Sequence, residues 1–170
     1  SATGLWLKPD GTKMYIIGAD GDDVNEYDLS SAWDVSTASY SQNFSIASQE
    51  TVPQQVIFKP DGTKMYITGA ISDSIHEYSL STAWDVSTAS YVQNFSVSTQ
   101  ATVPRGIIFN PDGTKLFMAC SGTDAVYQYT LTTAWDISSA SYDSVSFSVS
   151  TQATNCEMCK ILRVITSNHN

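Results

Sequence analysis

The chain has 170 residues, of which 42% are hydrophobic and 15% charged, a composition typical of a soluble globular domain. With 8 Lys and Arg residues and a net charge of −9, it has no basic face for phosphates, so we expect no nucleic-acid partner. No apolar run reaches the roughly 18 residues of a membrane-spanning helix, and no signal peptide is visible, so we expect no membrane partner.

A unit of 51 residues runs three times through the sequence. Two segments mark it, a Pro-Asp-Gly-Thr-Lys turn and an Ala-Trp-Asp triplet. The first lies within residues 8–15, 59–66 and, in weaker form, 110–117; the second lies at residues 32–34, 83–85 and 134–136. A fixed period of about 50 residues predicts a repeat architecture, in which each unit is one supersecondary element.

Each unit opens on a short, continuously apolar run, which predicts a first strand buried on both faces. The three runs are Leu5–Leu7, Val56–Phe58 and Ile107–Phe109. The Pro-Asp-Gly turn follows. Proline presets φ for a type I turn, and glycine supplies the left-handed position that closes a hairpin.

Three further strands complete each unit. The second is predicted at residues 13–18, 64–69 and 115–120, and the third at 24–29, 75–80 and 126–131. The fourth begins near Tyr40, Tyr91 and Tyr142, and its apolar residues alternate with serines, as in an outer strand with one wet face. No segment shows a helical period, so the chain is expected to be all-β.

Four short strands in each 51-residue unit predict a β-propeller of four-stranded antiparallel blades. We expect three blades at about 4–48, 55–99 and 105–150, within residues 1–154. The apolar triplet followed by Pro-Asp-Gly-Thr-Lys-Met-Tyr-Ile resembles the first hairpin of blades in YVTN and lactonase-like propellers. The segment Leu-Ser-x-Ala-Trp-Asp-Val-Ser-Thr-Ala-Ser-Tyr is similar to repeats of uncharacterised environmental bacterial and phage proteins. The sequence does not identify the compartment, and an extracellular or virion-associated location is our expectation.

The recurring tryptophans are candidate ligand-binding residues. Trp33, Trp84 and Trp135 are either exposed platforms for stacking sugars, as in a repeat lectin, or plugs at a corner of the blade. In the second interpretation the aspartate that follows each tryptophan caps the turn Val-Ser-Thr-Ala. Exact repetition favours the structural role, but a tandem lectin would repeat its site too.

A recurring aspartate in the variable loop is a second candidate. Asp22, Asp73 and Asp124 occupy equivalent positions, and Asp20 and Asp23 make the first loop acidic enough to suit calcium. The spacing matches no EF-hand, and recurrence favours a turn-forming aspartate. The sequence identifies neither a metal nor another cofactor.

The symmetry of the repeats argues against catalysis, because an enzyme site needs different groups that converge on one substrate. Glu26 and Glu77 recur, which does not specify an acid/base pair, and His76 stands alone on its strand. We therefore predict no catalytic residues and a non-enzymatic propeller module for binding or assembly, with a carbohydrate or protein ligand. The alternatives are a lactonase-like propeller hydrolase with a channel metal and the repeat lectin.

The end of the chain departs from the repeat. Residues 155–170 are expected to form a divergent tail or a partial fourth blade, and they carry one C-x-x-C pair, Cys156 and Cys159, without the second pair that a zinc ribbon needs. Cys120 is predicted to be a small buried filler.

Three blades do not close a ring, since propellers use about four to eight. We expect self-association in which two three-blade arcs close a six-bladed ring, unless the natural protein is longer.

Overall fold

The computed structural model describes residues 1–152 and is all-β, which confirms the predicted propeller architecture. Twelve strands form three four-stranded antiparallel sheets, each with its strands in chain order. Blade 1 contains β1 (Ala2–Leu7), β2 (Lys13–Gly18), β3 (Asp23–Leu29) and β4 (Ala38–Ser45). Blade 2 contains β5 (Pro53–Phe58), β6 (Lys64–Gly69), β7 (Ser74–Leu80) and β8 (Ala89–Ser96). Blade 3 contains β9 (Pro104–Phe109), β10 (Lys115–Cys120), β11 (Ala125–Leu131) and β12 (Ala140–Ser148).

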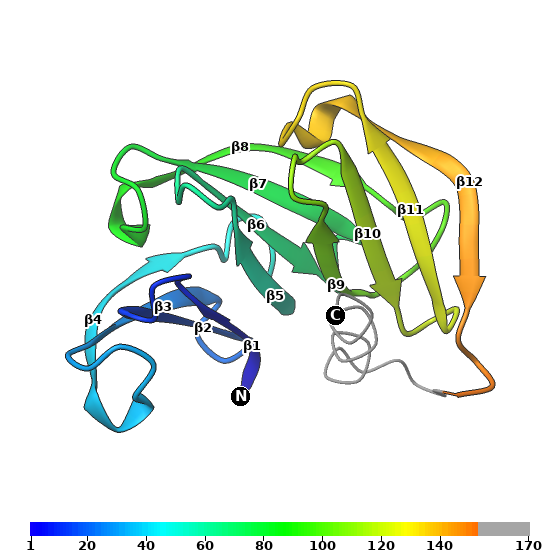
Figure 1. Cartoon of the computed structure of the whole chain (residues 1–170). Coiled ribbons are helices and arrows are strands. Elements are labelled where there is room, and N and C mark those ends of the chain that lie inside the picture. Colours follow the sequence, from blue (N-terminus) through cyan, green and yellow to red (C-terminus); the bar gives the residue numbers. More distant parts are fainter. Residues whose placement is uncertain (153–170) are drawn as a thin grey trace.

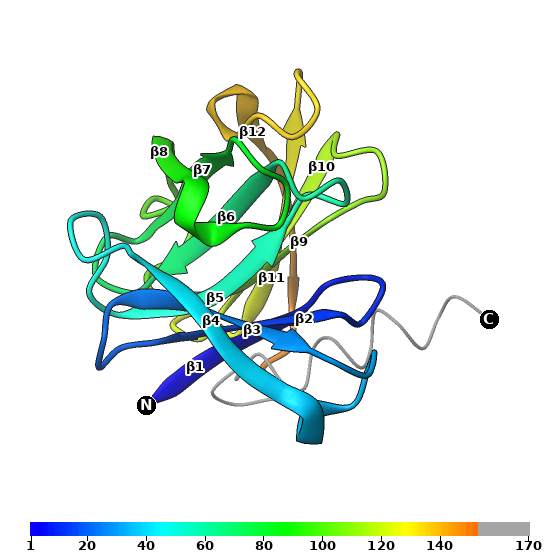
Figure 2. The ribbon, with the colours of Figure 1, turned by 90° about the vertical axis from the view of Figure 1, so that its left-hand side faces the viewer.

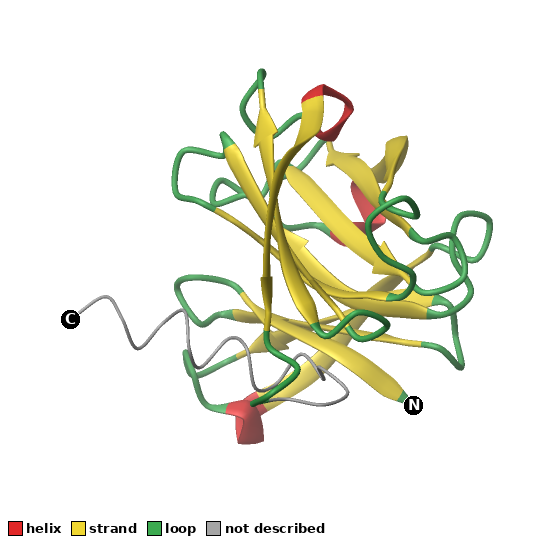
Figure 3. Cartoon of the chain, turned by 90° about the vertical axis from the view of Figure 1, so that its right-hand side faces the viewer, coloured by secondary structure: helices red, strands yellow, loops and turns green. Residues whose placement is uncertain are grey.

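Short 3₁₀ turns precede the outer strand of every blade. They are η1 (Val35–Thr37), η2 (Val86–Thr88) and η3 (Ile137–Ser139), and they supply the helical segments visible in Figure 3. The aspartate before each turn accepts a hydrogen bond from the backbone N–H two residues later, which confirms the predicted cap. Among residues 1–152, no helix is long and apolar enough to cross a membrane.

The three blades stand side by side in an open arc, with blade 1 and blade 3 at its ends (Figure 1). β5 packs against both β1 and β9, so blade 2 lies between its neighbours. Figure 2 shows the sheet of blade 1 beside that of blade 2. We call the side of a blade that faces the preceding blade its N-face, and the opposite side its C-face.

A hydrophobic core fills each of the two junctions. The C-face of blade 1 contributes Tyr15 and Ile17 to the first core, and the N-face of blade 2 contributes Val56 and Met65; all four are fully buried. The second core repeats this arrangement between blades 2 and 3. Because each core forms between two blades, a blade at the end of the arc has one apolar face without a partner.

The expectation that every first strand is buried on both faces is wrong for blade 1. Val56 and Ile107 are 0% and 4% exposed, whereas the equivalent Leu5 is 53% exposed, because no blade within residues 1–152 packs against its N-face. Cys120 is buried as predicted, and its thiol donates to the carbonyl of Thr102. Cys156, Cys159 and the divergent tail lie outside the described residues.

Candidate functional site

A row of three polar side chains crosses the C-face of blade 1. Strand pairing places Tyr15 of β2 opposite Glu26 of β3, and Glu26 opposite Gln42 of β4. Blade 2 carries the same row as Tyr66, Glu77 and Gln93. We call each set a clasp row, because its members bind the next blade.

The clasp row of blade 1 bonds to the segment 84–86 of blade 2, which contains the recurring Trp-Asp pair. Three bonds join the row to this segment: Tyr15 OH donates to Trp84 O (2.7 Å), Gln42 Nε2 donates to Asp85 Oδ1 (2.6 Å), and Val86 N donates to Glu26 Oε2 (3.0 Å). Burial raises the pKa of the Tyr15 hydroxyl, and the nearby Glu26 carboxylate raises it further, so the hydroxyl remains a donor.

The clasp row of blade 2 repeats these bonds with blade 3. Tyr66 OH donates to Trp135 O (2.7 Å), Gln93 Nε2 donates to Asp136 Oδ1 (2.8 Å), and Ile137 N donates to Glu77 Oε2 (3.2 Å). The Trp-Asp-Val/Ile segment is therefore the receiving half of a polar contact at both junctions. The sequence leaves this segment as a sugar platform or a corner plug and does not reveal its bonding partners, because these lie about 43 to 69 residues away.

The two glutamates at the centre of the clasp rows are buried and fully paired. Glu26 and Glu77 are 0% and 1% exposed, and their carboxylates accept from Lys13 Nζ (2.5 Å) and Lys64 Nζ (2.6 Å). With a lysine, a glutamine and a backbone N–H around each carboxylate, the charge is compensated at the junction. These contacts indicate that the recurring glutamates stabilise the junctions between blades.

The recurring tryptophans lie at the receiving side of the blades. Trp33, Trp84 and Trp135 have left-handed backbones with φ of 66°, 69° and 63°, and each indole covers the turn glycine of its own blade. The ring of Trp84 lies 5.5 Å from that of Phe58, and Lys8 of blade 1 lies over it. Among residues 1–152 no other blade packs against Trp33, which is 59% exposed.

The recurring loop aspartates are spread along the arc, one in each blade. Asp22, Asp73 and Asp124 have φ of 47°, 46° and 46°, and their backbone carbonyls accept from the residue that follows the outer strand of the same blade. They are turn residues, as their recurrence indicated. Within residues 1–152, no group of three His, Cys, Asp or Glu side chains lies close enough together to hold a metal ion.

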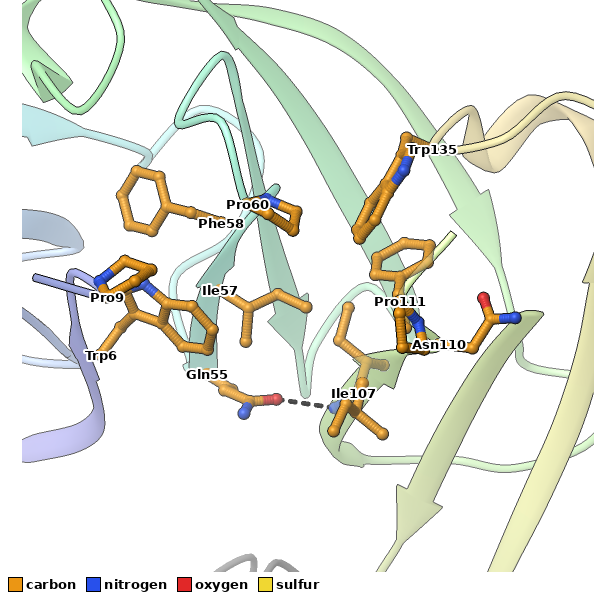
Figure 4. A pocket seen from close by; sticks show the side chains of 12 residues that line it. Trp6, Pro9, Gln55, Ile57, Phe58, Pro60, Ile107, Asn110, Pro111 and Trp135 are labelled. Atoms are coloured by element: carbon orange, nitrogen blue, oxygen red, sulfur yellow. Dashed lines mark hydrogen bonds between the residues drawn. The ribbon is translucent and has the colours of Figure 1, made fainter. Parts of the chain in front are cut away.

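An apolar groove of about 290 Å³ lies on the concave side of the arc, where the first strands of the three blades meet (Figure 4). Its walls include Trp6, Ile57 and Phe109 and the recurring turn prolines Pro9 and Pro60. None of its lining residues is ionisable, so the groove offers shape and apolar surface and no acid or base. The sequence analysis predicted no groove here; the turn prolines recur in the sequence, but only the arc shows that they line one groove.

His76 belongs to a small polar cluster that breaks the repeat. Ser72 Oγ lies 2.9 Å from His76 Nε2 and donates to Glu50 Oε2 at 2.7 Å. Burial alone would raise the pKa of Glu50, but the bonds from Ser72 and nearby backbone N–H groups lower it below its usual value. Burial lowers the pKa of His76. The carboxylate binds the serine and not the imidazole, so the order of a Ser-His-acid relay is absent from this cluster.

The open N-face of blade 1 repeats the surface that blades 2 and 3 bury. Val35 is 63% exposed, whereas the equivalent Val86 and Ile137 are each 0% exposed. Leu5 shows the same contrast. This face is thus built like an internal junction and lacks a neighbour among the described residues.

The open C-face of blade 3 is apolar as well. Phe147 is 70% exposed, whereas the equivalent Phe44 and Phe95 pack edge-on against Tyr78 and Tyr129 of the next blade, with ring centroids 5.7 and 5.6 Å apart. The two ends of the arc therefore expose an apolar N-face on blade 1 and an apolar C-face on blade 3. These are the two kinds of face that meet at each internal junction.

No protein-family model matches the sequence, and no curated protein matches it either. Among solved structures, the fold is similar to that of a proposed 6-phosphogluconolactonase from Bacteroides fragilis, with a TM-score of 0.63 and 17% identity over 85% of this chain and 38% of that one. It is also similar to the periplasmic gluconolactonase PpgL of Pseudomonas aeruginosa, with a TM-score of 0.56 and 17% identity over 81% of this chain and 36% of that one. A third match is the β-propeller domain of Cps50 (Swd1) from Myceliophteria thermophila, with a TM-score of 0.57 and 12% identity over 87% of this chain and 43% of that one.

These similarities confirm the resemblance to lactonase-like propellers at the level of fold. At such identities they carry no statement about activity. The chain spans about two fifths of the length of the solved propellers that it matches.

Proposed function

We propose that this chain is a non-enzymatic β-propeller module for assembly, and that its two open faces bind other copies of itself. The observation that carries this proposal is the contrast between Val35, which is 63% exposed, and its fully buried equivalents Val86 and Ile137. The open N-face of blade 1 is apolar, and its equivalents in blades 2 and 3 are buried between blades. Exposed apolar surfaces of this kind are typical of interaction sites. Two three-blade arcs joined head to tail satisfy both faces and make a six-bladed ring.

The recurring candidate residues fit this role. Trp33 and the segment after it lie on the open N-face of blade 1. The equivalent segments of blades 2 and 3 accept the bonds of a clasp row. The residues that line the groove include no ionisable side chain, and its polar side-chain groups include the amides of Gln55 and Asn110; this composition supports binding over acid/base catalysis. The groove supports a second binding role, for an apolar or aromatic group of a protein or carbohydrate ligand.

Sedimentation velocity at micromolar concentration tests the assembly. We expect a species heavier than the 18.5 kDa monomer, and we expect Val35→Asp to shift it to the monomer by placing a charge in the apolar contact. Val92→Asp is the matched control, because Val92 is 47% exposed on the outer strand of the middle blade, away from both open faces. A folded monomer at all concentrations, or equal effects of the two substitutions, would contradict the proposal.

A further inference from the structure

We propose that the open N-face of blade 1 is an unoccupied receiving half of the polar clasp, and that its occupant is the C-face of blade 3 from a second copy. This inference rests on the proposed assembly and goes further, because it assigns the direction of the contact and the residues that set its strength. Blade 3 supplies the apolar half of the contact, but other residues replace its clasp tyrosine, glutamate and glutamine. We therefore infer that the association is weak and reversible, and that positions 117, 128 and 145 control it.

The receiving half on blade 1 is complete. Trp33 has a φ of 66°, against 69° and 63° at Trp84 and Trp135, and Asp34 has the same extended backbone as Asp85. These values place the Trp33 carbonyl, the Asp34 carboxylate and the Val35 N–H in the arrangement that a clasp row meets at both junctions. Among residues 1–152, neither Trp33 O nor Val35 N has a hydrogen-bond partner.

On blade 3, other residues occupy all three positions of the clasp row. Phe117 of β10 lies opposite Gln128 of β11, which lies opposite Val145 of β12, so these residues occupy the positions of the tyrosine, glutamate and glutamine. Blade 3 thus lacks the phenol hydroxyl at position 117, the carboxylate at position 128 and the amide at position 145, and Gln128 places an amide where the other blades have the carboxylate. Blades 1 and 2 are identical at the same three positions.

A longer outer strand accompanies these replacements. β12 has nine residues, whereas β4 and β8 have eight, and the extra residue brings Asp143 next to the row. Asp143 accepts from Lys115 Nζ at 2.9 Å and from Gln128 Nε2 at 2.7 Å. The lysine that pairs with the clasp glutamate in the other blades therefore pairs with Asp143 in blade 3.

The apolar half of the contact remains on blade 3. Val145 and Phe147 are 50% and 70% exposed. Ile108 is the equivalent in blade 3 of Ile57, which is part of the second core. The step from blade 1 to blade 2 is repeated from blade 2 to blade 3, with equivalent contacts at both junctions. If the same blade-to-blade arrangement is repeated once more, the N-face of a second copy packs against the C-face of blade 3. We infer the occupant from this repetition.

A gain-of-function variant tests the inference. The substitutions Phe117→Tyr, Gln128→Glu and Val145→Gln together restore the clasp row on blade 3. Lys115 can hold the new carboxylate beside Asp143, since Lys13 contacts both Glu26 and Asp28 in blade 1. We expect the dissociation constant of self-association, measured by sedimentation of the full chain, to fall by about 10- to 100-fold, because the new bonds include one to a charged group.

Two further variants make the result specific. Val35→Asp added to the triple variant should abolish the gain, and Asp34→Ala should reduce it, because each removes part of the receiving half. The double variant Phe117→Tyr with Val145→Gln avoids the new buried charge and should retain a smaller gain; circular dichroism establishes that each variant is folded.

The inference is overturned if the folded double and triple variants associate no more tightly than the natural chain. We expect that result if another segment or a different protein covers the C-face of blade 3. It is equally overturned if the gain survives Val35→Asp. The proposed assembly fails separately, when the natural chain stays monomeric; a triple variant that associates in that case still supports the clasp.

Discussion

Truncation of one buried valine and of its exposed equivalent provides a direct test of the junctions. Val86 is fully buried between blades 1 and 2, and Val35 holds the same position in blade 1 with 63% of its surface exposed. Val86→Ala removes two buried carbons and leaves a cavity, which we expect to lower the free energy of unfolding by about 2–3 kcal/mol. Val35→Ala removes the same atoms from a solvated site, and we expect a loss under about 0.5 kcal/mol in the monomer.

Urea unfolding followed by tryptophan fluorescence measures both effects on the same scale. Dilute samples report the monomer, and a concentration series reports the contact between copies, since association stabilises the folded state by mass action. The cost of Val35→Ala should therefore rise with protein concentration, whereas that of Val86→Ala should not. Equal costs for the two substitutions in dilute solution would refute the assignment of the blade junctions.

Two further substitutions probe the turn and the polar cluster. Gly62 has a φ of +75°, and a Cβ there would overlap the ring of Trp84, so Gly62→Ala should destabilise the fold by about 2–4 kcal/mol and alter tryptophan emission; a cost no larger than that of Gly21→Ala, at an exposed glycine without positive φ, would contradict this reasoning. Because burial lowers the pKa of His76 from 6.5, the folded state binds its proton less readily than the unfolded state, and stability should fall as the pH drops below about 6.5. His76→Asn should flatten the melting temperature between pH 7 and about pH 5, and an unchanged pH dependence would argue against a buried neutral imidazole.

The fold could be predicted from the sequence because its signals are local. The Pro-Asp-Gly turn fixes each first hairpin through the φ of two residues, and Gly11 has the expected left-handed φ of +73°. Asp34 caps its turn through a bond to the N–H of Ser36, only two residues away. Neither feature requires knowledge of another blade.

The clasp rows could not be found in this way, because their bonds join residues that are distant in sequence. Glu26 bonds to the backbone of Val86, and nothing in the sequence near either residue identifies the other. The same limitation explains the error at Leu5, whose apolar run is that of a buried strand. Its exposure follows from its place at the end of the arc, which composition does not encode.

The two unequal halves of the open faces bear on how assembly stops. A head-to-tail contact closes into a ring if its rotations complete a turn, and otherwise it grows into a filament. If copies associate as proposed, a single contact without the clasp bonds is weak, and open chains should dissociate. A ring of two arcs forms two contacts from one encounter, and the second contact is intramolecular and gains the effective concentration of linked sites. In the proposed assembly, the replacement of the clasp side chains on blade 3 should therefore favour the closed ring over open growth, and we expect the mass to stop at two copies as the concentration rises.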